Sequence, residues 1–288
     1  MIALSSPRIE AALRDAYRFD VIAFKPGNVS LDAPGHGMTA ADFLASGRVA
    51  AAALASPEGA LGARILAAIA ATRAVAGCNT NLGLVLLTAQ LALAALRPAP
   101  ERDLRTRLGA VLACTTIADA DAVYRAIRIA APAGLGASTA QDVRDDPSVT
   151  LRHAMTIAAP RDRVARQYAT VFEDVFERGL PLLRAARERW HSLAWAAAAC
   201  HLDFLAALPD SHVARKHGTA RAAALRCRAR AVASALKACE NPGALLPSLH
   251  AFDSELKRSG VNPGTSADLT VASLAALFLE AALRAEQS

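Results

Sequence analysis

The sequence predicts an all-α protein that folds as a single compact helical bundle. Apolar residues recur at the helical period in most segments, and hydrophobic residues make up 53% of the chain. Aromatic residues make up only 5%, so the apolar content is mostly Ala, Leu and Val. Small side chains let helices approach closely, whereas a sheet protein would be richer in aromatic and β-branched residues.

The organisation of the chain indicates one domain over residues 1–288. No Ser/Gly-rich or Pro-rich linker is long enough to divide it, and no fixed-period repeat is present. The net charge of +6 favours anionic partners. Because no aromatic residues are interleaved with the basic ones, we do not expect a nucleic-acid partner.

Cysteine content and hydropathy predict a cytoplasmic protein without a membrane partner. The five cysteines are odd in number and form no C-x-x-C pair, which argues against a disulfide framework or a thiolate zinc site. Charged residues come early in the chain, so no signal-peptide core is present. The longest apolar run, residues 82–96, falls short of the roughly 20 residues that cross a bilayer.

The first half of the chain reads as a series of short helices. The segment 6–23 is amphipathic, with Ile9, Leu13 and Tyr17 on one face. Helical spacing then continues at 42–55, 61–76, 82–97, 101–115 and 119–131. Residues 132–150 are rich in Gly, Ser, Thr and Asp, which predicts a loop.

The second half predicts longer helices. A helix over 161–178 would gather its apolar residues on one side and place Asp162, Arg166 and Glu173 together on the other. Further helices are expected at 181–206, 210–238 and 265–284, with a short proline-bracketed stretch before the last. Thr265 and Asp268 resemble a capping box at the start of that last helix.

Two polar segments interrupt this helical pattern. They are Lys25-Pro26-Gly27-Asn28-Val29-Ser30 and Gly77-Cys78-Asn79-Thr80-Asn81-Leu82-Gly83. Gly supplies left-handed backbone angles, Pro removes a donor, and Asn and Ser offer short polar arms to backbone or ligand. We expect these segments to hold a small anionic ligand.

Further polar residues stand in loops or at helix starts, so the whole candidate set is scattered along the chain. It comprises Lys25, Asn28, Ser30, His36, Asn79, Thr80, Asn81, Asp119, Asp121, Asp142, Asp162, Arg166, Glu173, Asp174, Asp210, Arg215, Lys216, Asn262, Thr265 and Asp268. For each single aspartate the simpler interpretation is helix capping, which contributes about 1 kcal/mol. For the charged stretches it is a solvated helix face.

Taken in order, four segments resemble the triphosphoribosyl-dephospho-CoA synthase family over nearly the whole chain. They are Lys25–Ser30, Gly77–Gly83, Pro209–Lys216 and Asn262–Leu269. The resemblance implies an all-helical enzyme that transfers the 5-triphosphoribosyl part of ATP to the 2′-hydroxyl of dephospho-CoA and releases adenine. In the family, the product is the precursor of the prosthetic group of citrate lyase or malonate decarboxylase.

The chain departs from the best-known members of that family at two places. Those members read N-T-H-[KR]-G where this chain has Asn79-Thr80-Asn81-Leu82-Gly83. They also read G-S-H-x-D-M, whereas His36 here is followed by Gly37 and Met38 and the acid is missing. The N-T-N-L-G version resembles a branch found in methanogens and methylotrophs. Its acceptor would then be a tetrahydromethanopterin-pathway intermediate, since that cofactor contains an α-linked ribose 5-phosphate.

The implied reaction assigns roles to the candidate residues. We expect Asp119, Glu173, Asp174 and Asp210 to hold Mg²⁺ and to supply the base that accepts the hydroxyl proton, without a division between these roles. The remaining members of the set, apart from Asp121, Asp142 and Asp162, are expected to bind substrate. Lys25, Arg215 and Lys216 would bind the phosphates. The partners would be ATP, or another activated ribose, and a phosphorylated acceptor.

Two functions of other classes fit the same residues. One is a non-catalytic helical protein that binds a phosphorylated cofactor or a partner enzyme, and it would bind ATP without releasing adenine. The other is a nucleoside-phosphate hydrolase, which would release adenine with no acceptor present. The sequence leaves the oligomeric state open.

Overall fold

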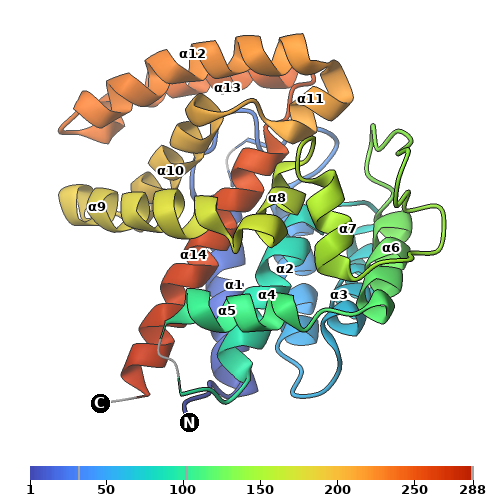
Figure 1. Ribbon diagram of the computed structural model, residues 1–288. Helices are drawn as coiled ribbons and strands as arrows, with labels where there is room; N and C mark the ends of the chain where they lie inside the picture. The colour runs from blue at the N-terminus through green and yellow to red at the C-terminus, as the bar shows by residue number, and fades with distance from the viewer. Residues whose placement is uncertain (32, 101–102, 287–288) are drawn as a thin grey trace.

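The computed structural model describes residues 1–31, 33–100 and 103–286, and these residues contain fourteen α-helices and no β-strand (Figure 1). The strand-like pairings among them are isolated bridges, such as the one between Ile2 and Ala99. The prediction of an all-α fold is confirmed.

The first half of the chain follows the predicted ranges closely. Its helices are α1 (Ser6–Ile22), α2 (Ala40–Leu54), α3 (Leu61–Ala76), α4 (Leu82–Leu96), α5 (Leu104–Ala113), α6 (Ile117–Ala130) and α7 (Leu151–Ala158). Helices α2 and α6 begin two residues earlier than predicted, because Thr39 and Thr116 close capping boxes with Asp42 and Asp119. The start of the helix predicted at 101–115 includes residues 101 and 102, which lie outside the described residues.

The second half is divided more finely than predicted. Its helices are α8 (Arg163–Thr170), the π-helix η1 (Asp174–Gly179), α9 (Leu180–Trp190), α10 (Leu193–Ala207), α11 (Ser211–His217), α12 (Thr219–Ala238), the 3₁₀-helix η2 (Pro242–Leu245), α13 (Leu246–Arg258) and α14 (Gly264–Ala285).

The prediction of one continuous helix over 161–178 is wrong. Val171 and Phe172 take left-handed φ angles of 51° and 56°, which residues other than glycine rarely adopt. The chain turns there and buries the Phe172 side chain completely. Similar breaks, at His191 with φ 48° and at Gly218 with φ 88°, divide the helices predicted at 181–206 and 210–238. Apolar periodicity continues across these breaks, so the sequence pattern does not reveal them.

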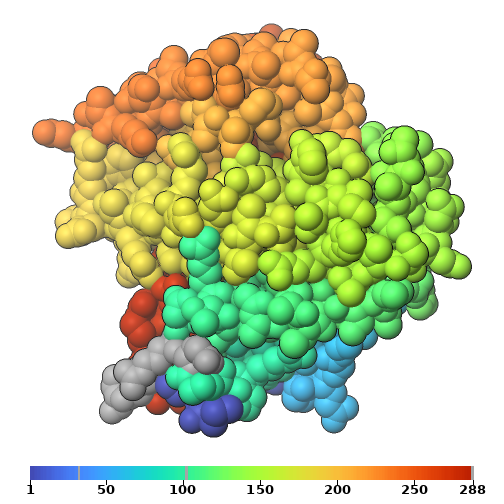
Figure 2. Space-filling view, in the orientation of Figure 1, coloured from blue at the N-terminus to red at the C-terminus, as the bar shows by residue number. Residues whose placement is uncertain are grey.

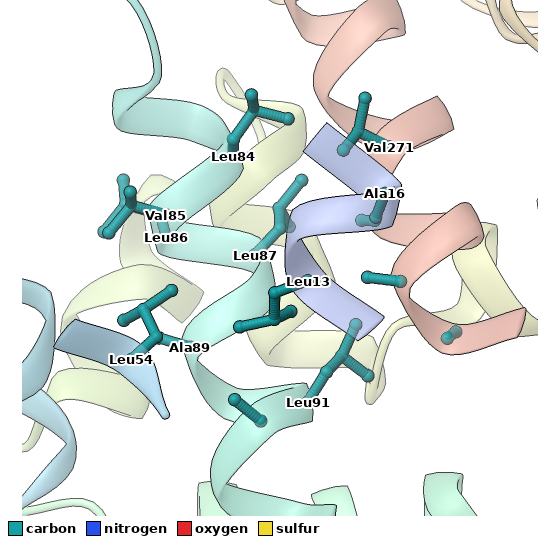
Figure 3. Close-up of a cluster of buried hydrophobic side chains, with 14 of the residues drawn as sticks. Leu13, Ala16, Leu54, Leu84, Val85, Leu86, Leu87, Ala89, Leu91 and Val271 are labelled. Carbon is teal, nitrogen blue, oxygen red and sulfur yellow. The ribbon is translucent and has the colours of Figure 1, made fainter. Parts of the chain in front are cut away.

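Helix α4 lies at the centre of the larger core and packs against α1, α3, α5 and α14. Figure 3 shows the apolar side chains of α4 gathered with Leu13 and Ala16 of α1, Leu54 of α2 and Val271 of α14; those labelled on α4 are Leu84, Val85, Leu86, Leu87, Ala89 and Leu91. Twelve consecutive positions of α4, from Leu84 to Ala95, are buried against other protein atoms, which explains why the segment is apolar on nearly all sides.

A second apolar cluster joins α10, α12 and α13 at one end of the molecule. In Figure 2 the segment that contains α12 lies along the top, above the segment that contains α9 and α10. Helix α14 runs from this layer to the opposite end of the molecule, where the N-terminus of the chain also lies (Figure 1). Its N-terminal end is therefore placed between the two clusters.

Among the described residues, α14 is the one helix long and apolar enough to cross a membrane by length and composition. Its most apolar window is 72% buried within the structure. The central helix of a globular protein has the same properties, and burial of this kind accounts for the composition of α14.

Candidate active site

A cavity of about 680 Å³ lies between α4, α6, α7, α8, α11 and the start of α14. All four polar segments of the sequence contribute to its wall, although up to about 240 residues separate them. The predicted site residues that line it are Asn28, His36, Asn79, Thr80, Asn81, Arg215, Lys216, Asn262, Thr265 and Asp268.

The segment from Lys25 to Ser30 is fixed against the residues that precede α14. Gly27 has a left-handed φ of 83°, and a Cβ there would lie 2.7 Å from Pro263 Cδ. The Gly27 N–H donates to Asp253 Oδ1 over 2.8 Å, and Asn28 Nδ2 donates to Asn262 Oδ1 over 3.0 Å. Glycine is therefore required at 27 both by its conformation and by the close approach of the proline.

The second polar segment connects α3 to α4. Gly77 ends α3 in a left-handed conformation with φ 67°, as helix C-termini often do. The Asn79 side chain then accepts the N–H of Leu82 over 3.1 Å, at the start of α4. Thr80 donates to Ser46 Oγ over 2.7 Å and Asn81 Nδ2 donates to Thr72 Oγ1 over 3.1 Å. The predicted capping of α4 by this loop is confirmed for Asn79.

Asp268 does not cap α14, which corrects the capping-box prediction. The N-cap residue of α14 is Pro263, and Thr265 Oγ1 instead accepts the backbone N–H of His212 over 3.1 Å. The Asp268 carboxylate points across to α4, where a Cβ on Gly83 would lie 1.9 Å from Oδ2. Asp268 lines the cavity as a result.

Positively charged and imidazole side chains gather at the α11 end of the cavity. Arg215 forms an ion pair with Asp162 over 3.0 Å. Lys216 makes no hydrogen bond or ion pair with any described residue and is exposed. Burial, together with Arg215 and Lys216, lowers the pKa of His212 to about 4, so its imidazole is neutral at pH 7. Burial also lowers the pKa of His36, which bonds to Gly27 O.

Four aspartates line the cavity, and three of them have cationic partners. Asp20 lies 2.9 Å from Lys25 Nζ, Asp142 binds Arg144 at 2.8 Å, and Asp162 pairs with Arg215. Within the described part of the chain, the Asp268 carboxylate accepts no hydrogen bond and forms no ion pair. Burial and the nearby Asp20, Asp210 and Asp162 raise the pKa of Asp268 well above its ordinary value.

The sequence interpretation missed several cavity residues. They include Asp20, the third residue from the end of α1, and Tyr124 on α6, whereas Asp142, in the long loop that follows, belongs to the candidate set without an assigned role. Tyr124 donates to Gln141 O over 3.0 Å, which holds this loop against the cavity. Asp20 and Tyr124 stand in no polar segment, so the residue pattern did not indicate them. The length of the loop 132–150 was the available signal, because a loop of 19 residues without secondary structure is usually functional.

Lys25 and Ser30 do not reach the cavity. The Lys25 side chain is fully buried behind the wall, where its ammonium pairs with Asp20 and donates to Asp20 O. Ser30 is also buried, with its N–H on Ala33 O. The predicted contact of Lys25 with phosphate therefore has no support in the geometry, since its ammonium is paired with Asp20 inside the protein.

Asp119 and Asp210 lie outside the cavity wall and act as caps. Asp119 accepts the N–H of Gly62 over 2.8 Å and that of Thr116 over 2.9 Å. Asp210 accepts the N–H of Val213 over 3.0 Å and that of Ser266 over 2.8 Å. Since backbone donors take both oxygens of each carboxylate, these aspartates connect helices instead of facing a ligand.

Arg166, Glu173 and Asp174 form a separate ion-pair network around the break between α8 and η1. Arg166 pairs with Glu173 over 2.8 Å and with Asp174 over 3.3 Å, and Arg163 binds Asp174 over 2.6 Å. This network stabilises the left-handed turn at 171–172 and does not line the cavity. The predicted catalytic roles of Glu173 and Asp174 thus have no support in the geometry.

The four predicted Mg²⁺ ligands do not form a metal centre. Asp119, Glu173, Asp174 and Asp210 are spread over α6, η1 and α11, and each is bound by protein donors. No cluster of three or more His, Cys, Asp or Glu suited to a metal ion occurs in residues 1–31, 33–100 and 103–286. The donor set that we predicted therefore does not fit the ion.

Comparisons with known proteins bear on the family and the fold of the chain. No curated protein matches the chain. A crystal structure from Archaeoglobus fulgidus, provisionally described as a triphosphoribosyl-dephospho-CoA synthase, shares its fold with a TM-score of 0.63 and 23% identity, over 83% of this chain and 98% of that one. A family model described as ATP:dephospho-CoA triphosphoribosyl transferase matches residues 6–287. The chain therefore belongs to the ATP:dephospho-CoA triphosphoribosyl transferase family.

Proposed function

We propose that this protein transfers the triphosphoribosyl group of ATP to a hydroxyl of a dephospho-CoA-like acceptor, with adenine as the leaving group. The observation that carries the proposal is the convergence of four distant polar segments on one cavity of about 680 Å³. This volume lies in the range of cavities that enclose small ligands. Its wall combines cations, carboxylates and apolar side chains, and a nucleotide needs all three.

The triphosphate would bind at the α11 end of the cavity. Lys216 is the cation there without a described partner, and Arg215 can turn from Asp162 toward a more highly charged anion. Neutral His212 adds a ring N–H donor, because its lowered pKa of about 4 leaves it uncharged at pH 7. Hydrogen bonds to charged groups contribute about 1.5–3 kcal/mol each.

The adenine ring would bind the apolar part of the wall. Leu86 of α4, Ile127 of α6, Met155 of α7 and Val164 of α8 line the cavity together. Aliphatic and thioether side chains suit the faces of a planar heterocycle, and Met adapts its shape easily. This placement would leave the ribose between the heterocycle and the phosphates.

The chemistry requires a proton acceptor and charge stabilisation. The bond from the acceptor oxygen to ribose C1 forms while the bond from C1 to adenine breaks, through an oxocarbenium-like state. The hydroxyl proton passes to a base and a proton is delivered to the departing adenine. Since the predicted acids lie outside the cavity, the candidates for the base are the cavity-lining Asp20, Asp142, Asp162 and Asp268.

Mg²⁺ enters this proposal as the counter-ion of the triphosphate. In nucleotide sites Mg²⁺ keeps several waters and binds mainly to phosphate oxygens. No protein ligand is assigned to it, because the four acids predicted for that role do not fit. A cytoplasmic location belongs to the same proposal, since all five cysteines are free.

A tetrahydromethanopterin-pathway intermediate is a second candidate acceptor. The observation that favours it is Leu82, which lines the cavity at the position where the best-known members of the family carry a cation. An apolar side chain cannot neutralise a phosphate of dephospho-CoA. It can instead contact a pterin ring, so the acceptor would differ although the transfer stays the same.

One experiment tests the transfer and separates the alternatives. Purified protein is incubated with Mg²⁺ and ATP, first alone, then with dephospho-CoA, then with a pterin-containing metabolite extract, and free adenine and ribosylated product are measured by mass spectrometry. Adenine formed only with an acceptor supports the transferase. Adenine without an acceptor supports a hydrolase, and ATP binding without adenine under any condition supports a binding protein.

A further inference from the structure

The α4–α14 side of the cavity carries hydrogen-bond acceptors that have no donor. Asn28 and Asn81 are each only 4% exposed, and both line the cavity. Their Nδ2 groups donate to Asn262 and Thr72, whereas no donor among the described residues reaches either Oδ1. A buried acceptor without a partner costs about 1–3 kcal/mol, which a ligand that donates to it would recover.

Asp268 belongs to the same side. Its carboxylate rests against Gly83, two residues after Asn81, so the carboxylate and the Asn81 amide flank the first turn of α4. The other three cavity aspartates each have a cationic partner, but Asp268 has none in the described residues. A carboxylate kept unpaired in a cavity awaits a donor from a ligand.

A phosphate group of the ligand cannot supply the hydrogen-bond donor that these acceptors lack. Phosphate oxygens at neutral pH accept hydrogen bonds and carry negative charge, so a carboxylate and two amide oxygens would repel them. Sugar hydroxyls donate, and a carboxylate that accepts from ribose hydroxyls is the usual device of dinucleotide sites. The exocyclic amine of adenine also donates. The apolar side chains of α6, α7 and α8 suit that ring better, however, because they leave its faces dry.

We propose that Asp268 and Asn81 hold the ribose of the nucleotide donor through its 2′- and 3′-hydroxyls, and that this contact makes the enzyme select ribonucleotides. The proposal rests on the proposed function, because it takes the nucleotide as the donor substrate. The sequence analysis expected Asp268 and Asn81 to bind substrate, and the proposal assigns them to the sugar, next to the reacting carbon. Gly83 then serves the same contact by leaving room for the carboxylate.

The test compares the affinities of ATP and 2′,3′-dideoxy-ATP by calorimetry, with full-length protein and no acceptor. Wild type should bind the dideoxy analogue about tenfold to a hundredfold more weakly, since a site built for hydroxyls is left unpaired without them. In Asp268→Asn and Asp268→Ala the ratio of the dissociation constant of the analogue to that of ATP should fall to about three or less. Asn81→Ala should lower it partly.

The matched control is Lys216→Ala at the phosphate end. It should weaken both nucleotides by the same factor and leave the ratio as in wild type. Asp268→Asn has nearly the shape of the native side chain, so it reports the ribose contact even if Asp268→Ala does not fold. Circular dichroism and melting curves verify the fold of each variant.

Several results would overturn the proposal. Equal affinity of wild type for both nucleotides would do so, as would a ratio unchanged in both Asp268 variants. Weaker binding of inosine triphosphate, with the dideoxy analogue bound as well as ATP, would assign the acceptors to the adenine amine instead. Ribose selectivity that depends on Asp268, but without adenine release in the transfer assay, would overturn the proposed function and leave this inference standing. No ATP binding at all would overturn both.

Discussion

The carboxylate of Asp268 lies directly against the α-carbon of Gly83. A Cβ at Gly83 would lie 1.9 Å from Asp268 Oδ2 and 2.5 Å from its carboxyl carbon, closer than non-bonded atoms approach. The last helix of the chain and the start of α4 therefore meet through a contact that only glycine allows. This contact joins the second and fourth polar segments of the sequence, which are about 185 residues apart.

Gly83→Ala is expected to displace Asp268 from the cavity. The added methyl group must push the carboxylate away or shift α4 relative to α14, and such overpacking costs about 1–3 kcal/mol. The free energy of unfolding should fall by that amount, and adenine release should fall more steeply than stability. Urea unfolding and the transfer assay measure the two effects.

Gly109→Ala is the matched control for this substitution. Gly109 also lies within a helix, but its Cβ would meet only Val171 Cγ1, at 3.7 Å. Alanine is favoured over glycine in a helix interior by up to about 1 kcal/mol, so this variant should be as stable as wild type or more so. If Gly83→Ala behaved like Gly109→Ala, the contact with Asp268 would not constrain the site.

Asp268→Asn is expected to change stability in a pH-dependent way. Burial, with Asp20, Asp210 and Asp162 nearby, raises the pKa of the Asp268 carboxyl in the folded protein. The stability that the protonated carboxyl contributes is complete below its ordinary pKa near 4, and is lost as the pH rises through the raised value. Asparagine cannot ionise, so near pH 4 the variant should have the melting temperature of wild type. As the pH rises toward neutral, its melting temperature should exceed that of wild type by a growing margin.

Melting curves from pH 4 to pH 9 test this expectation. A melting-temperature difference that does not vary with pH would mean that the carboxyl ionises in the fold as it does in the unfolded chain. A gain in stability with a loss of adenine release would identify Asp268 as a group kept for function at the expense of stability.

Lys216→Ala and Arg215→Ala are expected to differ although the residues are neighbours. Lys216 has no partner within the described ranges, so its loss should weaken ATP binding by about tenfold or more and leave stability unchanged. Arg215 pairs with Asp162, the cap of α8, and donates to Ala133 O. Its loss should therefore weaken binding and also lower the melting temperature. Unchanged ATP affinity in Lys216→Ala would place this lysine on the solvated surface.

The sequence predicted the helical fold and the first two polar segments from local signals, and the resemblance to a family grouped them with the other two. Periodicity marks a helix, and Gly, Pro and Asn mark the places where a helix cannot continue. The contacts that give each polar residue its role are long-range. Lys25 forms an ion pair with Asp20, and Asp210 accepts a hydrogen bond from Ser266. Neither role follows from the residue type. The helix breaks at Val171 because the turn there buries Phe172. The backbone preferences of these two residues alone would not favour such a break.

Asp119→Ala is expected to affect stability without changing nucleotide affinity. The Asp119 carboxylate caps α6 and accepts the N–H of Gly62 at the start of α3. Its removal should lower the free energy of unfolding by about 1–2 kcal/mol. Asp121→Ala is the control, because Asp121 has only a 4.0 Å contact with Arg125 and its loss should change stability by less than about 0.5 kcal/mol. Weaker ATP binding in a folded Asp119→Ala protein would restore the predicted metal or catalytic role.

The last prediction concerns Leu82, which lines the cavity as the first residue of α4. If the acceptor is the pterin-pathway intermediate, wild type should give little or no triphosphoribosyl product from ATP and dephospho-CoA, because an apolar residue stands where a cation could bind phosphate. Leu82→Lys places an ammonium at that position. If the cation decides the acceptor, this variant should turn over dephospho-CoA at least tenfold faster than wild type, since one charged hydrogen bond contributes about 1.5–3 kcal/mol. Leu82→Met is the control for the loss of the leucine shape and should leave the rate as in wild type. Product formation is followed by mass spectrometry. Rapid turnover by wild type would show that Arg215 and Lys216 already neutralise the triphosphate, and that Leu82 does not determine the acceptor.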